Sequence, residues 1–204
     1  MKIGIIGAGM IGSTTAQLFV NAGHEVAISN SRGPDSLLDL AAHLGPLAHA
    51  MTVEEAARWG DVILLAVPCR SPQALPSADA ARGKIVIDAM NPYGPDGKVM
   101  DLGPGTSSES TRERLPGARL VKAFNTIWFK HLAERGRPDL PPDDRHAIFV
   151  AGDDAPAKRV VMDLVDDIGF GAVDTGSLVD GGRQQPDTPL YNKVLTARDA
   201  RKLV

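Results

Sequence analysis

The sequence predicts an α/β protein with a doubly wound, mostly parallel β-sheet. Short, continuous apolar runs of strand length alternate with helical segments over about three quarters of the chain, as in a sheet that helices cover on both faces. A glycine-rich turn directly follows the first apolar run and opens the first helix. The alternation indicates a parallel sheet that is covered on both faces.

The elements of the first half follow from apolar patterns and end signals. The first helix ends at a turn in which Gly23 is the expected C-terminal cap. Pro34 and Asp35 begin a helix that reaches about residue 44. Thr52 and Glu55 form a capping box that begins another short helix. The apolar strands are expected at residues 2–6, 25–29, 62–67, 85–87 and 119–123, with the first helix at 10–21.

The second half is predicted to continue with fewer elements. A loop rich in proline and charge at residues 136–144 precedes a strand at 146–151. An amphipathic helix begins at Asp153 or Asp154, and a strand at 172–174 follows it. Residues 181–192 look irregular, and Thr196 opens a short final helix. Since no repeat or linker interrupts the chain, we expect a single domain over residues 1–204. Its short C-terminal extension adds strands and helices over about residues 145–204.

Three glycines in the first turn predict a nucleotide site. Gly7, Gly9 and Gly12 form a G-x-G-x-x-G motif between a strand and a helix, the context that the motif requires. Gly7 permits the tight turn, Gly9 lets backbone N–H groups approach a diphosphate, and Gly12 lets the helix pack close to the sheet. A glycine-rich turn without a ligand is the alternative. We therefore expect a Rossmann-type dinucleotide-binding fold, with Met10 and Ile11 also in contact with the cofactor.

The end of the second strand predicts NADP(H) rather than NAD(H). An NAD site usually places an acidic residue there to bind the ribose hydroxyls. Here the sequence reads Asn30, Ser31 and Arg32, and Arg32 lies 20 residues after Gly12. A guanidinium can bind a 2′-phosphate with two hydrogen bonds, and Ser31 can donate a hydroxyl. A solvated arginine in a loop is the alternative, and Asp35 is better explained as a helix-start residue.

The rest of the cofactor is expected across the ends of the later strands. Ligands of this fold bind in the crevice at the carboxyl edge of the sheet. Cys69 adjoins one of these turns but has no neighbouring His or Lys to lower its pKa, so we expect a bystander. The turns expected to contact the nicotinamide ribose and ring contain Ala66, Val67, Pro68, Asn91, Phe124 and Asn125.

Several segments carry a family resemblance. They are residues 2–12, 30–32, 66–68, 121–127, 152–162 and 174–177, of which 121–127 (VKAFNTI) is the most specific. With these segments the chain resembles the NADPH-dependent reductases of the deazaflavin coenzyme (coenzyme F-420:NADP oxidoreductases). It also resembles the NADPH-binding reductase domain of the six-transmembrane metalloreductases, which reduces flavin.

The resemblance implies roles for particular residues. Ser31 and Arg32 would hold the 2′-phosphate, Val67 and Pro68 would flank the nicotinamide, and the loop after Phe124 would lie under the second ring system. One departure concerns Asn125: the archaeal deazaflavin reductases carry a histidine there, and asparagine matches the metalloreductase pattern. The identity of the electron acceptor therefore stays open. The segment 183–192 has no obvious counterpart in either group.

The expected chemistry is hydride transfer between stacked rings. Few residues follow the last predicted strand, so an open shelf beside the nicotinamide is easier to build than a deep pocket. Ile127 and Trp128 are the expected contacts of the acceptor, unless they join subunits instead. No catalytic residue is fixed, although Asn125 and Thr126 are candidates. The five histidines lack metal-ligand spacing, so we expect no metal.

Three functions remain open at this stage. The first is an NADP(H)-dependent oxidoreductase that exchanges hydride with a flavin or a deazaflavin of the F-420 kind. The second is a direct reductase of a small carbonyl or imine, with Lys122 or Asn125 polarising the substrate. Lys122 falls within a strand, which favours a structural or surface role for it. The third is a non-catalytic NADPH sensor.

Bulk composition narrows the partners. The chain has 204 residues and a net charge of −3, whereas a nucleic-acid binder usually has a basic excess. A single cysteine fits a reducing compartment, and no apolar stretch is long enough to cross a membrane. We expect a cytoplasmic enzyme with a small-molecule acceptor, neither membrane nor nucleic acid as a partner, and homodimerisation as an option.

Overall fold

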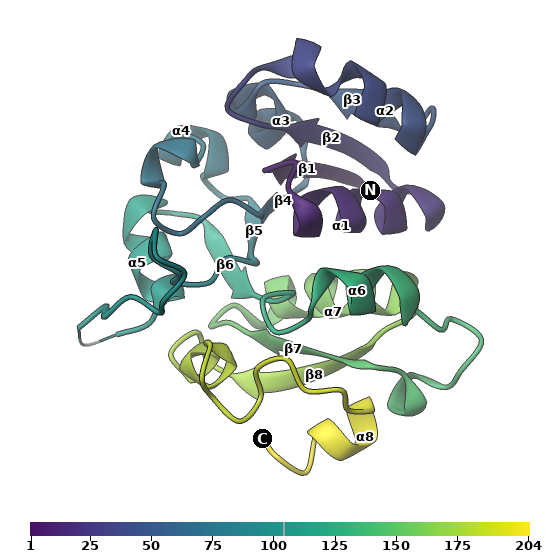
Figure 1. Ribbon diagram of the computed structural model, residues 1–204, viewed down its shortest axis with the longest axis vertical. Helices are drawn as coiled ribbons and strands as arrows, with labels where there is room; N and C mark the ends of the chain where they lie inside the picture. Colours follow the sequence, from purple (N-terminus) through teal and green to yellow (C-terminus); the bar gives the residue numbers. More distant parts are fainter. Residues whose placement is uncertain (104) are drawn as a thin grey trace.

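The computed structural model describes residues 1–103 and 105–204, and it places eight strands in one sheet (Figure 1). The strand order is β3-β2-β1-β4-β5-β6-β7-β8. Every neighbouring pair is parallel except β6 and β7, which meet antiparallel at Lys122 and Ala151. The doubly wound, mostly parallel α/β fold is therefore confirmed. The strands are β1 (Lys2–Ile6), β2 (Glu25–Ser29), β3 (Ala48–Ala50), β4 (Val62–Leu65), β5 (Ile85–Asp88), β6 (Arg119–Lys122), β7 (Ala147–Ala151) and β8 (Gly171–Gly176).

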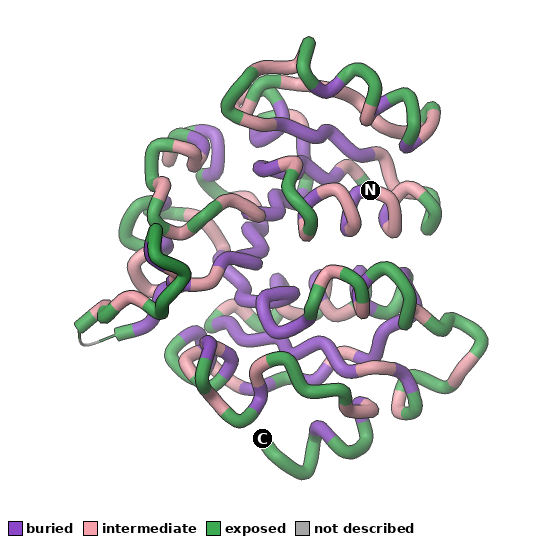
Figure 2. The backbone as a smooth tube through the Cα atoms, in the orientation of Figure 1, coloured by how far each residue is buried: buried purple, intermediate pink, exposed green. Residues whose placement is uncertain are grey.

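Helices cover both faces of the sheet, and the buried backbone lies between them (Figure 2). One face packs against α1 (Met10–Asn21), α2 (Leu38–Leu44), α6 (Phe129–Glu134) and α7 (Ala155–Asp167). The other face packs against α3 (Val53–Trp59), α4 (Ala78–Ala81) and α5 (Ser107–Arg114). A small third cluster places α8 (Ala197–Ala200) on β7 and β8.

The two cores explain why the strands are apolar without interruption. Side chains alternate between the faces of a strand. Ile3 and Ile5 of β1 therefore pack with α1, while Ile6 packs with α3 on the opposite face. Strands buried on both sides cannot show an alternating polar pattern.

Several elements differ from the sequence-based expectation. The strand expected at 62–67 ends at Leu65, shortly before Pro68, which has no N–H to donate to a neighbouring strand. The helix expected from Pro34 begins as one 3-10 turn (Pro34–Leu37) and becomes α-helical only at Leu38. Among the strands and α-helices, β3, α4, α5 and α6 were not predicted. Nor were the 3-10 turns at Pro72–Ala74, Pro142–Asp144 and Asp180–Gln184, the last of which falls in the segment expected to be irregular. β3 and α4 are too short for a periodic pattern, and α5 is almost entirely polar.

The fold places the order reversal between β1 and β4. β1 leads through α1 to β2 on one side, and β4 leads to β5 and β6 on the other. Loops that leave the carboxyl ends of β1 and β4 therefore diverge and open a crevice, the usual ligand site of such sheets.

Candidate cofactor and active site

The glycine turn between β1 and α1 has no room for side chains at two positions. Gly7 has a φ of 111°, and a Cβ there would lie 2.5 Å from the carbonyl oxygen of Ala66. A Cβ at Gly12 would lie 1.8 Å from the carbonyl oxygen of Gly7. Gly7 and Gly12 therefore let the turn, β4 and α1 approach closely, as the motif predicts.

Gly9 differs, because a Cβ there would meet no atom within 4 Å. It is the N-cap residue of α1, and no side chain caps the helix. The first N–H groups of a helix have no partner within the helix and carry its positive end. Open space in front of an uncapped, 12-residue helix fits a bound diphosphate.

A cavity of about 650 Å³ lies in front of this turn. It brings together the ends of β1, β2 and β4. The predicted cofactor residues that line it are Gly7, Gly9, Asn30, Ser31, Ala66, Val67 and Pro68. The sequence analysis missed its opposite wall, which consists of Val53, Glu54, Ser71, Gln73, Ala74 and Leu75. The other predicted cofactor residues do not line it: Met10 (64% exposed), Ile11 (partly buried), Gly12, Arg32, Asn91, Phe124 and Asn125.

Glu54 is an acidic residue of the opposite wall. Its carboxylate oxygens accept hydrogen bonds from the Ser77 N–H at 2.5 Å and from the Ser77 hydroxyl at 2.9 Å, and Glu54 Oε2 lies 3.9 Å from Arg58 Nη2. The carboxylate is thus engaged with the start of α4 and with Arg58.

The end of β2 is shaped by Asn30. Its Oδ1 accepts a hydrogen bond from the Arg32 N–H at 2.8 Å, and its Nδ2 donates to the Ser36 hydroxyl at 2.9 Å. Ser31 and Arg32 are exposed, and in the described part of the chain no carboxylate forms an ion pair with Arg32. The turn therefore presents a hydroxyl and an available guanidinium beside the cavity. Asp35 lies in the 3-10 turn that follows, as expected of a helix-start residue.

The ends of β5 and β6 are joined by two asparagines. Asn91 Nδ2 donates to the Asn125 carbonyl at 2.8 Å, and Asn125 Nδ2 donates to Asn91 Oδ1 at 3.1 Å and to the Gln184 carbonyl at 2.7 Å. Asn125 and Thr126 are only 3% and 4% exposed. These two catalytic candidates are thus covered, and both hydrogens of the Asn125 amide are already used.

The cover comes from the irregular segment 181–192. Besides the Gln184 carbonyl, it supplies the Asn192 N–H, which donates to the Thr126 carbonyl at 3.0 Å. It also supplies Tyr191, whose hydroxyl accepts from the Tyr93 hydroxyl at 3.2 Å and from Asn91 Nδ2 at 3.5 Å. Burial raises the pKa of Tyr191, so this phenol stays protonated at neutral pH.

The chain is similar in sequence and in structure to several known proteins. Residues 2–92 match the family described as "NADP oxidoreductase coenzyme F420-dependent". Hypothetical protein SMa0349 from Sinorhizobium meliloti is 36% identical, with a TM-score of 0.83 over 96% of this chain and 95% of that protein. A provisionally assigned F420-dependent NADP-reductase from Arthrobacter sp. FB24 is 27% identical, with a TM-score of 0.73 over 100% of this chain and 90% of that one.

The resemblance to the coenzyme F420-dependent NADP oxidoreductases is therefore confirmed, over residues 2–92 by the family match and over the whole chain by the Arthrobacter protein.

The matching family and the Arthrobacter protein are both described as NADP-dependent oxidoreductases. Human metalloreductase STEAP2 is a more distant relative, 24% identical over 193 residues, which is 93% of this chain and 36% of that protein. The chain spans about a third of the length of the curated relatives that it matches, which are covered over 34–36%.

Two of the residues that the sequence assigns to the site lie in the core instead. Phe124 is fully buried with a φ of 65°, and its ring packs edge-to-face on Phe19 at 6.2 Å, so its side chain does not face a ligand. Ile127 is 6% exposed and packs in the α1 core, so in this structure its side chain is covered where contact with an acceptor was expected. Trp128 is 43% exposed and remains available.

Lys122 has the structural role that its position in a strand favoured. Lys122 and Asp88 are both 0% exposed, and Lys122 Nζ lies 3.7 Å from Asp88 Oδ2. Lys122 Nζ also donates to the Met90 carbonyl at 3.1 Å, and the Ser108 hydroxyl donates to Asp88 at 2.7 Å. The pair therefore ties β5, β6 and α5 together beneath the turn at Asn91, out of reach of a substrate.

No side chain in the described residues stands out as a nucleophile or a metal site. Burial and the Asp88 carboxylate raise the pKa of the Cys69 thiol, which keeps it neutral. Residues 1–103 and 105–204 contain no group of three or more His, Cys, Asp or Glu that could hold a metal ion. Over the same residues, no helix combines the length and the apolar composition needed to cross a membrane.

Proposed function

We propose that the protein transfers hydride between NADPH and the ring of a flavin or a deazaflavin stacked on the nicotinamide. The observation that carries this proposal is the cavity at the ends of β1, β2 and β4, in which the glycine turn, Ser31 and Pro68 line one continuous space. Its span from the end of β2 to the loop after β4 suits an extended dinucleotide. The name of the Arthrobacter relative, an F420-dependent NADP-reductase, supports an acceptor of this class.

Each part of the cavity has a role in this proposal. Ser31, which lines the cavity, and the neighbouring exposed Arg32 bind the 2′-phosphate. The N-terminus of α1 binds the diphosphate at Gly9, and Val67 with Pro68 positions the nicotinamide. The cofactor supplies the hydride, and the protein supplies orientation. Transfer needs the reacting atoms about 3–3.5 Å apart, which an open shelf at the exposed Pro68 permits for a flat ring.

A direct reductase of a small carbonyl or imine is the second candidate. That reaction needs a proton donor, and neither Lys122 nor Asn125 fits this role. Lys122 is buried in an ion pair with Asp88, and both amide hydrogens of Asn125 already form hydrogen bonds. Tyr191 is the residue that favours this alternative. Its oxygen accepts two hydrogen bonds, so its own proton is left to donate.

Single-turnover oxidation of NADPH separates these functions. With a flavin or a deazaflavin, we expect rapid loss of the nicotinamide absorbance and a rate that varies little with pH across neutrality. Trp128→Ala should slow this step if the acceptor lies against the exposed Trp128. Tyr191→Phe, with Tyr93→Phe as its matched control, should slow only a reaction that takes a proton from the phenol.

Three results would change the assignment. Turnover of a carbonyl or imine, but of no flavin-like ring, would favour the second candidate. Tight NADPH binding without turnover on any acceptor would favour a sensor. Equal rates in wild type and Trp128→Ala would move the acceptor away from that residue.

Two expectations accompany the proposed function. The single cysteine suits a reducing cytoplasm. The exposed Trp128 is where we expect a homodimer to form, if one forms. Sedimentation of wild type and Trp128→Ala tests the second point.

A further inference from the structure

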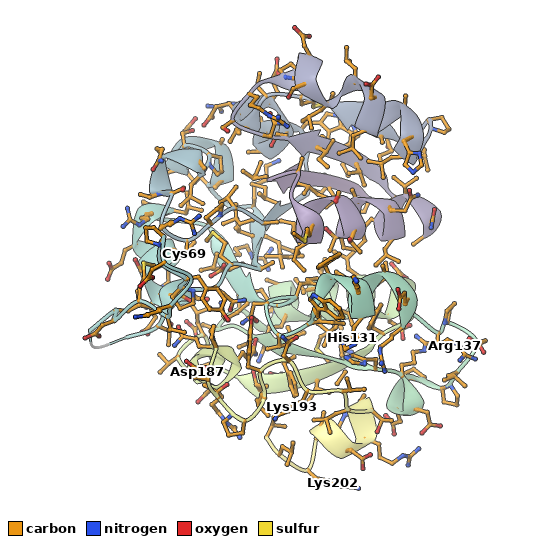
Figure 3. The ribbon with its side chains drawn as sticks, in the orientation of Figure 1. Cys69, His131, Arg137, Asp187, Lys193 and Lys202 are labelled. Carbon is orange, nitrogen blue, oxygen red and sulfur yellow. The ribbon has the colours of Figure 1, made fainter. Side chains whose placement is uncertain are left out.

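A second cavity, of about 320 Å³, borders the loop that follows β4. Pro68, Ser71 and Leu75 line this cavity as well as the larger one, so the loop is a wall common to the two. The far wall comes from Met90, from residues 100 and 102, and from the second half of α5. Cys69, which also lines it, is labelled in Figure 3 on the α5 side of the molecule.

The charge of this second cavity comes from two arginines. Arg70 and Arg114 line it, and no aspartate or glutamate does. Within residues 1–103 and 105–204, neither guanidinium forms an ion pair with a carboxylate. Arg70 Nη1 donates at 3.4 Å to the Tyr93 carbonyl, a contact that holds its side chain beside the cavity. Two cations without a carboxylate partner favour an anionic ligand.

The remaining lining restricts the ligand further. Leu75, Met90, Met100 and Leu102 supply apolar surface, and Ser110 adds a hydroxyl at the α5 wall. The Cys69 thiol adds no negative charge, because burial and the nearby Asp88 carboxylate raise its pKa. The cavity is therefore suited to a group that joins an anionic end to an apolar or ring-bearing part.

We propose that this cavity binds the phosphorylated side chain of the acceptor, with the phosphate held by Arg70 and Arg114. The inference rests on the proposed function, because it takes the acceptor to be a flavin or a deazaflavin. About 320 Å³ lies at the lower limit of ligand cavities, so it holds a side chain rather than a whole coenzyme. The ring then stays outside, at Pro68, where the two cavities share a wall and where the nicotinamide is expected.

Riboflavin and flavin mononucleotide test the site, since they differ only in the phosphate. We expect NADPH oxidation to show a KM for flavin mononucleotide about tenfold or more below that for riboflavin, the size of one charge-assisted contact. Arg70→Gln and Arg114→Gln should each remove most of this preference by raising the KM for flavin mononucleotide alone. Arg159→Gln is the matched control, because Arg159 is an exposed helical arginine that does not line the cavity.

The affinity for NADPH separates this site from the cofactor site. It should be unchanged in all three variants, and a loss in Arg114→Gln would mean that the cofactor itself occupies the cavity. Equal KM values for the two flavins in wild type, or a preference that survives both substitutions, would overturn the inference.

A direct measurement of flavin binding makes the test independent of turnover. Quenching of flavin fluorescence by the NADP⁺-loaded protein measures both flavins directly. If no flavin is reduced, the proposed function fails. A phosphate-dependent affinity that requires Arg70 and Arg114 would still support the cavity as an anion site. Equal affinities for the two flavins would contradict the proposed anion site.

Discussion

Replacing Gly9 with valine separates cofactor binding from folding. A Cβ at this position meets no atom within 4 Å, and the backbone lies at φ −79° and ψ −169°, an extended conformation that valine adopts readily. The side chain would instead project into the space in front of α1, where the cofactor diphosphate is expected. Gly9→Val should therefore fold normally and fail to bind NADPH.

The magnitudes follow from the geometry. Valine is a poorer N-cap than glycine by about 1 kcal/mol, and a glycine replacement reduces unfolded-state entropy by about 0.4–1 kcal/mol, so the free energy of unfolding should change little. Loss of two N–H contacts to a charged phosphate, each about 1.5–3 kcal/mol, should weaken NADPH binding by roughly a hundredfold or more.

Calorimetric titration with NADPH and thermal unfolding test this pair of effects. Gly12→Ala is the contrasting control, because its Cβ would lie 1.8 Å from the Gly7 carbonyl oxygen. That variant should lose stability itself. A folded Gly9→Val protein that binds NADPH within about threefold of wild type would refute the placement of the diphosphate.

Three further predictions concern specificity, the buried ion pair and pH. Arg32→Ala should remove a preference for NADP(H) over NAD(H) of roughly tenfold to a hundredfold, measured by titration of both nucleotides, and leave NAD(H) binding nearly unchanged. Lys122→Met should lower the free energy of unfolding by about 3–5 kcal/mol in urea, because Asp88, 0% exposed, would keep a buried charge without its partner. The double variant Lys122→Met/Asp88→Asn should recover part of that loss. Burial lowers the pKa of His146 from 6.5 to about 4, so the unfolded chain takes up its proton first. The stability that neutral His146 contributes is present above pH 6.5 and is lost as the pH falls towards about 4; His146→Gln should flatten the urea midpoint over that window.

The first half of the fold could be predicted because its signals are local. The strands are apolar throughout, the glycines mark the turn, and Thr52 with Glu55 forms the capping box that the structure contains at α3. Gly23 follows α1 with a φ of 86°, and its N–H donates to the Val20 carbonyl, as expected of a C-terminal cap. Each of these features needs only residues within one or two turns of one another.

α5 shows where a usable signal was overlooked. Its residues are SSESTRER, which give no apolar stripe, yet Thr106 and Glu109 form a capping box with both reciprocal hydrogen bonds. A capping box usually marks a helix start when an apolar run follows it. No apolar run follows Thr106 and Glu109, so the motif alone was the signal. The helix is fixed instead on its buried side, where the Ser108 hydroxyl donates a hydrogen bond to the buried Asp88 carboxylate.

The contacts of the acceptor side could not be predicted, because they join residues far apart in the chain. Asn91, Asn125, Gln184 and Tyr191 meet through hydrogen bonds across up to 100 residues. The sequence marked residues 121–127 as the most specific stretch, and burial of Asn125 and Ile127 gives that stretch a structural task. A specific motif can therefore report the packing of a turn as readily as contact with a substrate.

This burial bears on where an acceptor can bind. With the segment 181–192 hydrogen-bonded over Asn125 and Thr126, a ring that reached those side chains would have to displace the contacts of Gln184 and Asn192. A ring that approaches from Pro68 displaces none of them, since Pro68 is exposed and lines both cavities. Approach from the Pro68 side therefore costs less rearrangement. It also puts the acceptor's tail within reach of Arg70 and Arg114, whereas approach over Asn125 would leave those two arginines without a role.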